Sequence, residues 1–221
     1  MTANTALPHA GAPVYAAGAP LETAGLVVIL LHGRGADAAD ILGLSGEIAP
    51  PGAEDRIAFL APEAEGHVWY PQPFRQPLVI NEPWLSGALA KIDALVDHVR
   101  AERPELPVIV GGFSQGACLS LEYLARGSQP ITGVVAFSGA LIGPSIADRR
   151  PIGDLSGRRV FLGCGDRDQY FTLDIAGDSA AALAGAGAAV DFRTYPGMGH
   201  TINADEIEAA RAVVAHALPG R

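Results

Sequence analysis

The sequence of 221 residues predicts an α/β fold, a three-layer sandwich with a mostly parallel sheet of about six to seven strands. Two observations predict this fold. Short apolar runs alternate with segments of helical periodicity along most of the chain, which is typical of a parallel sheet with helical crossovers. The run Leu26–Leu31 is also apolar at every position, as a parallel strand buried on both faces requires.

The elements are expected in the following order. Residues 1–24 are rich in alanine, glycine and proline, and we expect an N-terminal tail with an edge strand near residues 13–17. Residues 25–221 are expected to form a single domain. Strands are expected at Leu26–Leu31, 57–61, 108–112, 131–137, 159–164 and 190–195. Helices are expected at 37–48, from an Asn81 cap to Arg103, and at 117–124, 172–186 and 205–217, with a long irregular loop over 62–81.

The composition limits the classes of function. An apolar fraction of 49% indicates a globular chain with a large core, and a net charge of −9 argues against binding of nucleic acid or anionic membranes. The sequence shows no cleavable signal and no run of about 18 apolar residues. Its two cysteines, Cys118 and Cys164, form no disulfide framework. We therefore expect a cytoplasmic protein without stable membrane association.

A serine stands at the apex of a predicted strand–turn–helix. The segment Gly112-Phe113-Ser114-Gln115-Gly116 directly follows an apolar strand-like run and precedes a small-residue helix. This arrangement is typical of the nucleophile elbow of α/β-hydrolases. Larger residues two positions before or after the serine would collide with the neighbouring strand and helix. Because the chain contains 27 glycines, this pattern can occur by chance. The interpretation therefore rests on the predicted strand before the serine and the predicted helix after it.

Further polar residues follow other predicted strands. Asp166 and Asp168 follow the fifth strand, and His200 follows the sixth. Carboxyl ends of parallel strands meet at one edge of the sheet, and the order Ser, Asp, His is that of the α/β-hydrolase triad. Either aspartate satisfies the spacing. No zinc-ligand motif is present, so we expect neither a metal nor a cofactor.

Six motifs make the chain resemble the phospholipase/carboxylesterase family of α/β-hydrolases, which includes acyl-protein thioesterases. The resemblance runs from about Leu26 to the C-terminus, and the loop around residues 69–75 is closer to bacterial carboxylesterase-like members. The motifs are LHGRGAD (31–37), WYP (69–71), GGFSQGA (111–117), FSGAL (137–141), GDRD (165–168) and GMGH (197–200).

The resemblance implies a role for each matching residue. Ser114 would be the nucleophile and His200 the base. Asp168 corresponds to the acid of the family, which leaves Asp166 to hold the loop. The oxyanion hole would use the backbone N–H groups of Arg34 and Gln115.

The loop over 62–81 is expected to face the substrate. Its aromatic residues Trp69, Tyr70 and Phe74, together with Leu141, would form an apolar wall for an acyl or aryl group. The alternative is a loop that folds its own small core. His32 is expected to be a hydrogen-bonding scaffold.

These observations predict a serine carboxylesterase that hydrolyses esters of small to medium acyl or aryl groups through an acyl-enzyme on Ser114. One alternative is an acyl-protein thioesterase or lysophospholipase acting on longer chains. Another is a non-catalytic binding module on the same fold. Dinucleotide binding at Gly33-Arg34-Gly35-x-x-Ala38, with Glu63 on a ribose, would explain none of the Ser/Asp/His set. The partner would be a small-molecule ester, and both a monomer and a homodimer remain open.

Overall fold

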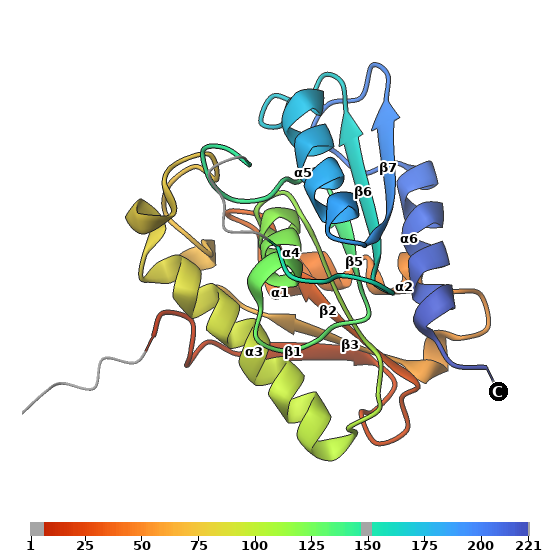
Figure 1. Ribbon diagram of the computed structural model, residues 1–221. Coiled ribbons are helices and arrows are strands. Elements are labelled where there is room, and N and C mark those ends of the chain that lie inside the picture. The colour runs from red at the N-terminus through yellow and green to blue at the C-terminus, as the bar shows by residue number, and fades with distance from the viewer. Residues whose placement is uncertain (1–6, 147–151, 221) are drawn as a thin grey trace, which may run out of the picture.

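A seven-stranded sheet forms the centre of the molecule in the computed structural model, which describes residues 7–146 and 152–220 (Figure 1). The strand order is β1-β3-β2-β4-β5-β6-β7. Only β1 runs antiparallel to its neighbour, and all other described pairs are parallel. The strands are β1 (Val14–Gly18), β2 (Leu26–Leu31), β3 (Ile57–Pro62), β4 (Val108–Phe113), β5 (Gly133–Phe137), β6 (Arg159–Gly165) and β7 (Ala189–Tyr195).

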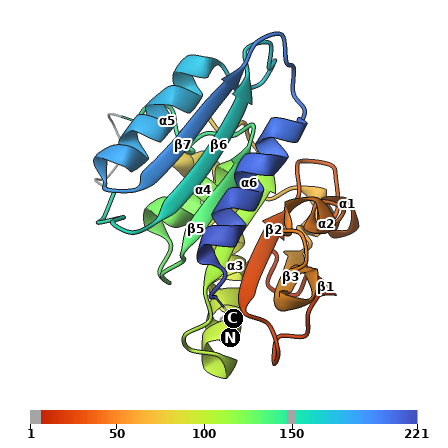
Figure 2. The ribbon, with the colours of Figure 1, turned by 90° about the vertical axis from the view of Figure 1, so that its right-hand side faces the viewer.

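Helices cover both faces of this sheet, which confirms the predicted three-layer sandwich. One face packs against α3 (Trp84–Glu102), α4 (Gln115–Arg126) and α5 (Leu173–Gly185). The other packs against α1 (Ala38–Leu42), α2 (Ser45–Ile48) and α6 (Ala204–Ala217), which Figure 2 shows on the side away from α5. Short 3₁₀ turns lie at Glu54–Arg56, Glu65–His67 and Leu78–Asn81. Among the described helices, none has the length and apolar character needed to cross a membrane.

Strand β2 shows why the sequence folds this way. Its alternate residues Val27, Ile29 and Leu31 belong to the core under α3, α4 and α5. Leu26, Val28 and Leu30 belong to the core under α1, α2 and α6. All six side chains are fully buried, so an unbroken apolar run is what this central strand requires.

The single helix predicted at 37–48 is two short helices. Asp37 caps α1, its side chain accepting a hydrogen bond of 2.8 Å from the Asp40 N–H. The N–H of Gly43 then bonds the carbonyl of Asp40, three residues back, and this tighter turn ends the helix. The chain restarts at Ser45 as α2.

The predicted cap at Asn81 is also wrong. Helix α3 begins at Trp84 with Pro83 at its N-cap. Asn81 is fully buried instead, and its Oδ1 accepts a hydrogen bond of 2.8 Å from the N–H of Gln72. The side chain therefore orders the preceding loop and not the helix.

The N-terminal segment is attached to the sheet and to this loop. Strand β1 forms an edge where the sequence predicts one, and pairs with β3 from Val14↔Pro62 to Gly18↔Ala58. Before it, His9 is fully buried between the loop and α3. One ring nitrogen accepts from the N–H of Glu65 at 3.0 Å, so the other carries the proton that is donated to the carbonyl of Trp69 at 3.0 Å.

Helix α6 starts with a capping box in which a buried glutamate takes part. The Asn203 side chain accepts from the N–H of Glu206, and the Glu206 carboxyl accepts from the N–H of Asn203, both at 2.9 Å. Its Oε1 is buried and has no hydrogen-bond partner within the described ranges. Burial raises the pKa of Glu206 from 4.5 to about 7.

This pKa predicts a pH-dependent stability. The folded chain holds the Glu206 proton to a higher pH than the unfolded chain, so the contribution of this one group to stability is fully present below about pH 4.5 and is lost as pH rises through about 7. We expect Glu206→Gln to gain stability relative to the wild type as pH rises from 4.5 to 8, by at most about 3 kcal/mol. Thermal unfolding at several pH values measures this difference. Glu208→Gln, an exposed change in the same helix, is the control, and equal pH dependence of the two variants would contradict the prediction.

Candidate active site

Ser114 occupies a sharp turn between β4 and α4. Its backbone has φ 56° and ψ −115°, and its N–H bonds the carbonyl of Phe137 at 3.0 Å. A methyl group added at Gly116 would lie 2.0 Å from the Leu31 carbonyl oxygen, and one added at Gly112 would lie 2.5 Å from the same atom. The structure thus confirms why glycine stands two residues before and after the serine.

Asp168 and His200 form a hydrogen-bonded pair beside this turn. Oδ2 of Asp168 lies 2.7 Å from Nδ1 of His200, and the aspartate side chain is fully buried. Oδ1 of Asp168 accepts the backbone N–H groups of Tyr170 and Phe171 at 2.8 and 3.1 Å. The carboxylate therefore orients the imidazole and holds its own loop, and the Nδ1 proton leaves Nε2 as the acceptor.

Asp166 has a different role from Asp168. Its Oδ1 accepts the N–H of Gly197 at 2.7 Å. The next residue, Arg167, donates its backbone N–H to the carbonyl of Met198 at 2.9 Å. These bonds fasten the loop after β6 to the loop that carries His200, so Asp166 holds the loop as expected from the sequence.

Three aromatic rings surround His200. Phe113 lies 4.6 Å and Tyr170 4.8 Å from the imidazole, between ring centroids, and Phe171 stacks on it at 5.8 Å. Phe171 also stacks on Phe74 at 4.7 Å, which joins the His200 environment to the long loop before α3. Phe113, Tyr170 and Phe171 are not among the residues predicted for the site, although each is within three residues of Ser114 or Asp168.

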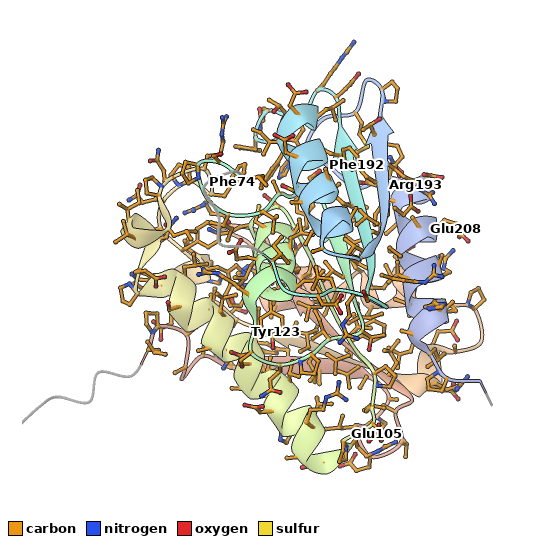
Figure 3. All side chains as sticks on the ribbon, viewed as in Figure 1. Phe74, Glu105, Tyr123, Phe192, Arg193 and Glu208 are labelled. Atoms are coloured by element: carbon orange, nitrogen blue, oxygen red, sulfur yellow. The ribbon has the colours of Figure 1, made fainter. Side chains whose placement is uncertain are left out.

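A cavity of about 600 Å³ opens in front of Ser114 and His200. This size lies within the range of sites for small molecules. Tyr70 and Phe74 line it as predicted, and Figure 3 shows Phe74 among the loops at the upper left. Its walls are mainly apolar and aromatic, with a few polar groups. The other lining residues are Gly33, Arg34, Ala36, Asp40, Pro71, Pro73, Arg75, Phe113, Gln115, Cys118, Gln169, Tyr170 and Phe171.

Two residues predicted to contact the substrate are core residues instead. Trp69 is fully buried and donates its indole N–H to the carbonyl of His32 at 3.0 Å. Leu141 is 2% exposed, and its N–H bonds the hydroxyl of Ser179 at 3.0 Å. Neither lines the cavity, so the prediction of substrate contact is wrong for both. The loop over 62–81 thus both forms a small core, through Trp69, and walls the cavity, through Tyr70 and Phe74.

The backbone N–H groups of Arg34 and Gln115 belong to two segments that meet at Ser114. Gln115 is the first residue of α4, where N–H groups have no partner within the helix. Arg34 lies in the turn after β2, which is packed against the elbow at Gly33. Neither N–H has an acceptor in the part of the chain that the structure describes. Both residues line the cavity.

His32 is a scaffold in this turn, as predicted. Its Nδ1 lies 2.8 Å from the carbonyl of Gly33, and its Nε2 accepts the N–H of Ala64 at 3.1 Å. Burial lowers the pKa of His32, so the ring is a neutral bridge between two loops. His67 is different, since Nδ1 of its exposed ring lies 3.1 Å from the carbonyl of Ala36 and 2.9 Å from a carboxyl oxygen of Glu63.

The two cysteines are unsuited to nucleophilic chemistry. Both are buried, and burial raises the pKa of the Cys118 and Cys164 thiols to about 12. Among residues 7–146 and 152–220, no group of three or more His, Cys, Asp or Glu side chains is placed to hold a metal ion. The cavity is lined by Ser114 and His200.

Comparisons with known proteins identify the family and the fold. The family model described as Phospholipase/Carboxylesterase matches residues 17–217. The crystal structure of a phospholipase/carboxylesterase from Dyadobacter fermentans is 35% identical, with a TM-score of 0.82 over 93% of this chain and 97% of that one. The structure of esterase PE8 is 26% identical, with a TM-score of 0.74 over 94% and 98%.

Curated relatives match over shorter regions. Carboxylesterase SOBER1 from Arabidopsis thaliana is 29% identical over 67% of this chain and 65% of its own length. Acyl-protein thioesterase 1 from Neurospora crassa is 26% identical over 58% of this chain, and the match spans 53% of the relative. The chain thus spans about half to two thirds of the length of these relatives. With a family model that covers residues 17–217, the chain belongs to the phospholipase/carboxylesterase family of α/β-hydrolases.

Proposed function

We propose that the protein is a serine carboxylesterase that forms an acyl-enzyme on Ser114. The observation that carries the proposal is the hydrogen bond between the buried Asp168 carboxylate and His200, a histidine that lines the same cavity as the strained Ser114. A nucleophile at an elbow, a base and an orienting acid are the three parts of a serine hydrolase triad. The carboxylesterase and esterase relatives support the same reaction class.

The first half of the reaction follows from these positions. The Ser114 hydroxyl attacks the ester carbonyl while Nε2 of His200 takes its proton, and Asp168 stabilises the imidazolium through Nδ1. The carbonyl oxygen becomes an oxyanion that accepts the N–H groups of Gln115 and Arg34. When the tetrahedral intermediate collapses, the bond to the leaving oxygen breaks and His200 returns the proton to it. An acyl-serine and an alcohol result.

The second half repeats these steps with water. His200 takes a proton from a water molecule, whose oxygen attacks the acyl-serine, and the same two N–H groups hold the second oxyanion. Collapse releases the carboxylic acid as His200 protonates the Ser114 oxygen. The reaction needs no metal or cofactor.

The walls of the cavity indicate the substrate class. Phe74, Phe113, Tyr170 and Phe171 offer ring faces and edges to an apolar group, which suits esters of small to medium acyl or aryl groups. Because some relatives are named acyl-protein thioesterase, thioesters of longer acyl chains are the second candidate for the substrate. A p-nitrophenyl ester series from acetate to palmitate separates the two, since an optimum at long chains would favour the thioesterase candidate.

Removal of the nucleophile gives the first test. We expect a fluorophosphonate to label the wild-type protein on Ser114, mapped by peptide mass, and Ser114→Ala to lose label and at least about 10⁴-fold in kcat. Ser128→Ala, at an exposed serine near the end of the same helix, is the matched control and should retain both. Full turnover by Ser114→Ala would refute the proposal, and ester binding without turnover by the wild type would favour the binding module.

The two aspartates give the second test. We expect Asp168→Asn to lose on the order of 10³- to 10⁴-fold in kcat, because the amide no longer holds the required tautomer of His200. In Asp166→Asn the acceptor of the Gly197 N–H becomes a neutral amide oxygen, which weakens a charge-assisted hydrogen bond, so this variant should lower the melting temperature and change kcat by less than about tenfold. Steady-state kinetics and thermal unfolding of both variants measure this, and a larger kcat loss for Asp166→Asn would reverse the assignment.

A further inference from the structure

We infer that the side chains of Arg34 and Gln115 position the oxyanion hole, because both donate hydrogen bonds to the carbonyl group of Tyr70. Both residues are expected to hold the oxyanion through backbone N–H groups, so this inference rests on the proposed function. Their side chains form hydrogen bonds elsewhere, with the segment 69–72. Arg34 and Gln115 are 81 positions apart in the sequence, yet they share this acceptor.

Both polar atoms of the Gln115 side chain form hydrogen bonds with this segment. It is 5% exposed, and its amide makes two hydrogen bonds. Oε1 accepts the N–H of Trp69 at 3.0 Å, and Nε2 donates to the carbonyl of Tyr70 at 2.9 Å. A buried amide with its oxygen and nitrogen both paired has one orientation, so Gln115 ties the start of α4 to the loop.

The Arg34 guanidinium donates hydrogen bonds to the same segment. One nitrogen donates to the Tyr70 carbonyl at 2.7 Å and also lies 3.4 Å from the carbonyl of Gln72, while the other donates to the Pro71 carbonyl at 3.2 Å. No carboxylate partner of Arg34 is found among the described residues. Three successive carbonyls that converge on one planar donor form a clamp, because the guanidinium is rigid and always charged.

The segment 69–72 is itself held by hydrogen bonds at both ends. Its bonds to Arg34 and Gln115 therefore fix where those two residues lie. The indole N–H of Trp69 bonds the carbonyl of His32, two residues before Arg34. At the other end, the N–H of Gln72 bonds the buried Asn81 side chain. The turn after β2, the start of α4 and the loop are therefore joined in one closed set of hydrogen bonds. Two N–H groups must lie within hydrogen-bond distance of a single oxyanion, and this set fixes their separation.

Steady-state kinetics of Arg34 variants of the whole protein test this inference. We expect Arg34→Met to lower kcat for a p-nitrophenyl ester about tenfold or more with KM changed less than about twofold, since misplaced catalytic groups can cost on the order of 10²-fold. Arg34→Lys keeps a charged donor near the Tyr70 carbonyl and should recover part of kcat. Arg34 is exposed, so these variants are expected to fold.

Arg100→Met is the matched control. Arg100 also donates to three carbonyls, those of Pro104, Leu106 and Pro130, but it lies on α3 away from the cavity. Its loss should lower the melting temperature without changing kcat more than about twofold. Gln115→Met combined with Arg34→Met should lose less than the product of the two single losses, because both act through one carbonyl.

The outcomes separate the two proposals. A wild type that hydrolyses the ester, with Arg34→Met equal to it in kcat, would overturn the clamp alone. A loss in Arg34→Met that Arg34→Lys does not recover, or that Arg100→Met matches, would show a structural role and also overturn it. A folded wild type with neither turnover nor a Ser114 adduct would overturn the proposed function and the clamp together.

Discussion

The backbones of β2 and α4 approach each other more closely than any side chain would allow, and the site depends on that approach. The Leu31 carbonyl lies against Gly112 and Gly116, so the chain must turn at Ser114 with a positive φ. This turn places the start of α4 beside the loop that follows β2. In the proposed reaction the N–H groups of Gln115 and Arg34 would hold one oxyanion, and the close approach of their segments permits this.

Local features of the sequence predicted the sheet and the order of the site residues. An unbroken apolar run such as Leu26–Leu31 is what a doubly buried strand requires, and the end of the strand indicates where a loop residue will lie. Ser114, Asp168 and His200 each lie within five residues after the end of a strand, so the topology brings them to one edge. The spacing left Asp166 and Asp168 open, and the family resemblance favoured Asp168, whose carboxylate lies 2.7 Å from Nδ1 of His200 in the structure.

The incorrect expectations at Trp69 and Asn81 concern contacts with residues that are not neighbours in the sequence. Trp69 is apolar and aromatic whether it faces a cavity or a core, and its burial depends on His32 and His9. Asn81 has the features of a helix cap in sequence, yet its oxygen bonds Gln72 across the loop. No periodicity encodes such partners, because irregular loops are ordered by individual side chains and not by a repeating pattern.

The two buried histidines have a consequence for how the protein responds to acid. His9 and His32 each accept a backbone N–H from the segment 64–65, and burial lowers the pKa of both below 6.5. The unfolded chain takes up protons on these rings first, so their contribution to stability is lost as pH falls below about 6.5. Protonation removes the acceptors that fasten the loop, while the central strands contain no ionisable partner of this kind within the described residues. Acid is therefore expected to weaken the attachment of this loop, which continues into the wall of the cavity, before it melts the sheet.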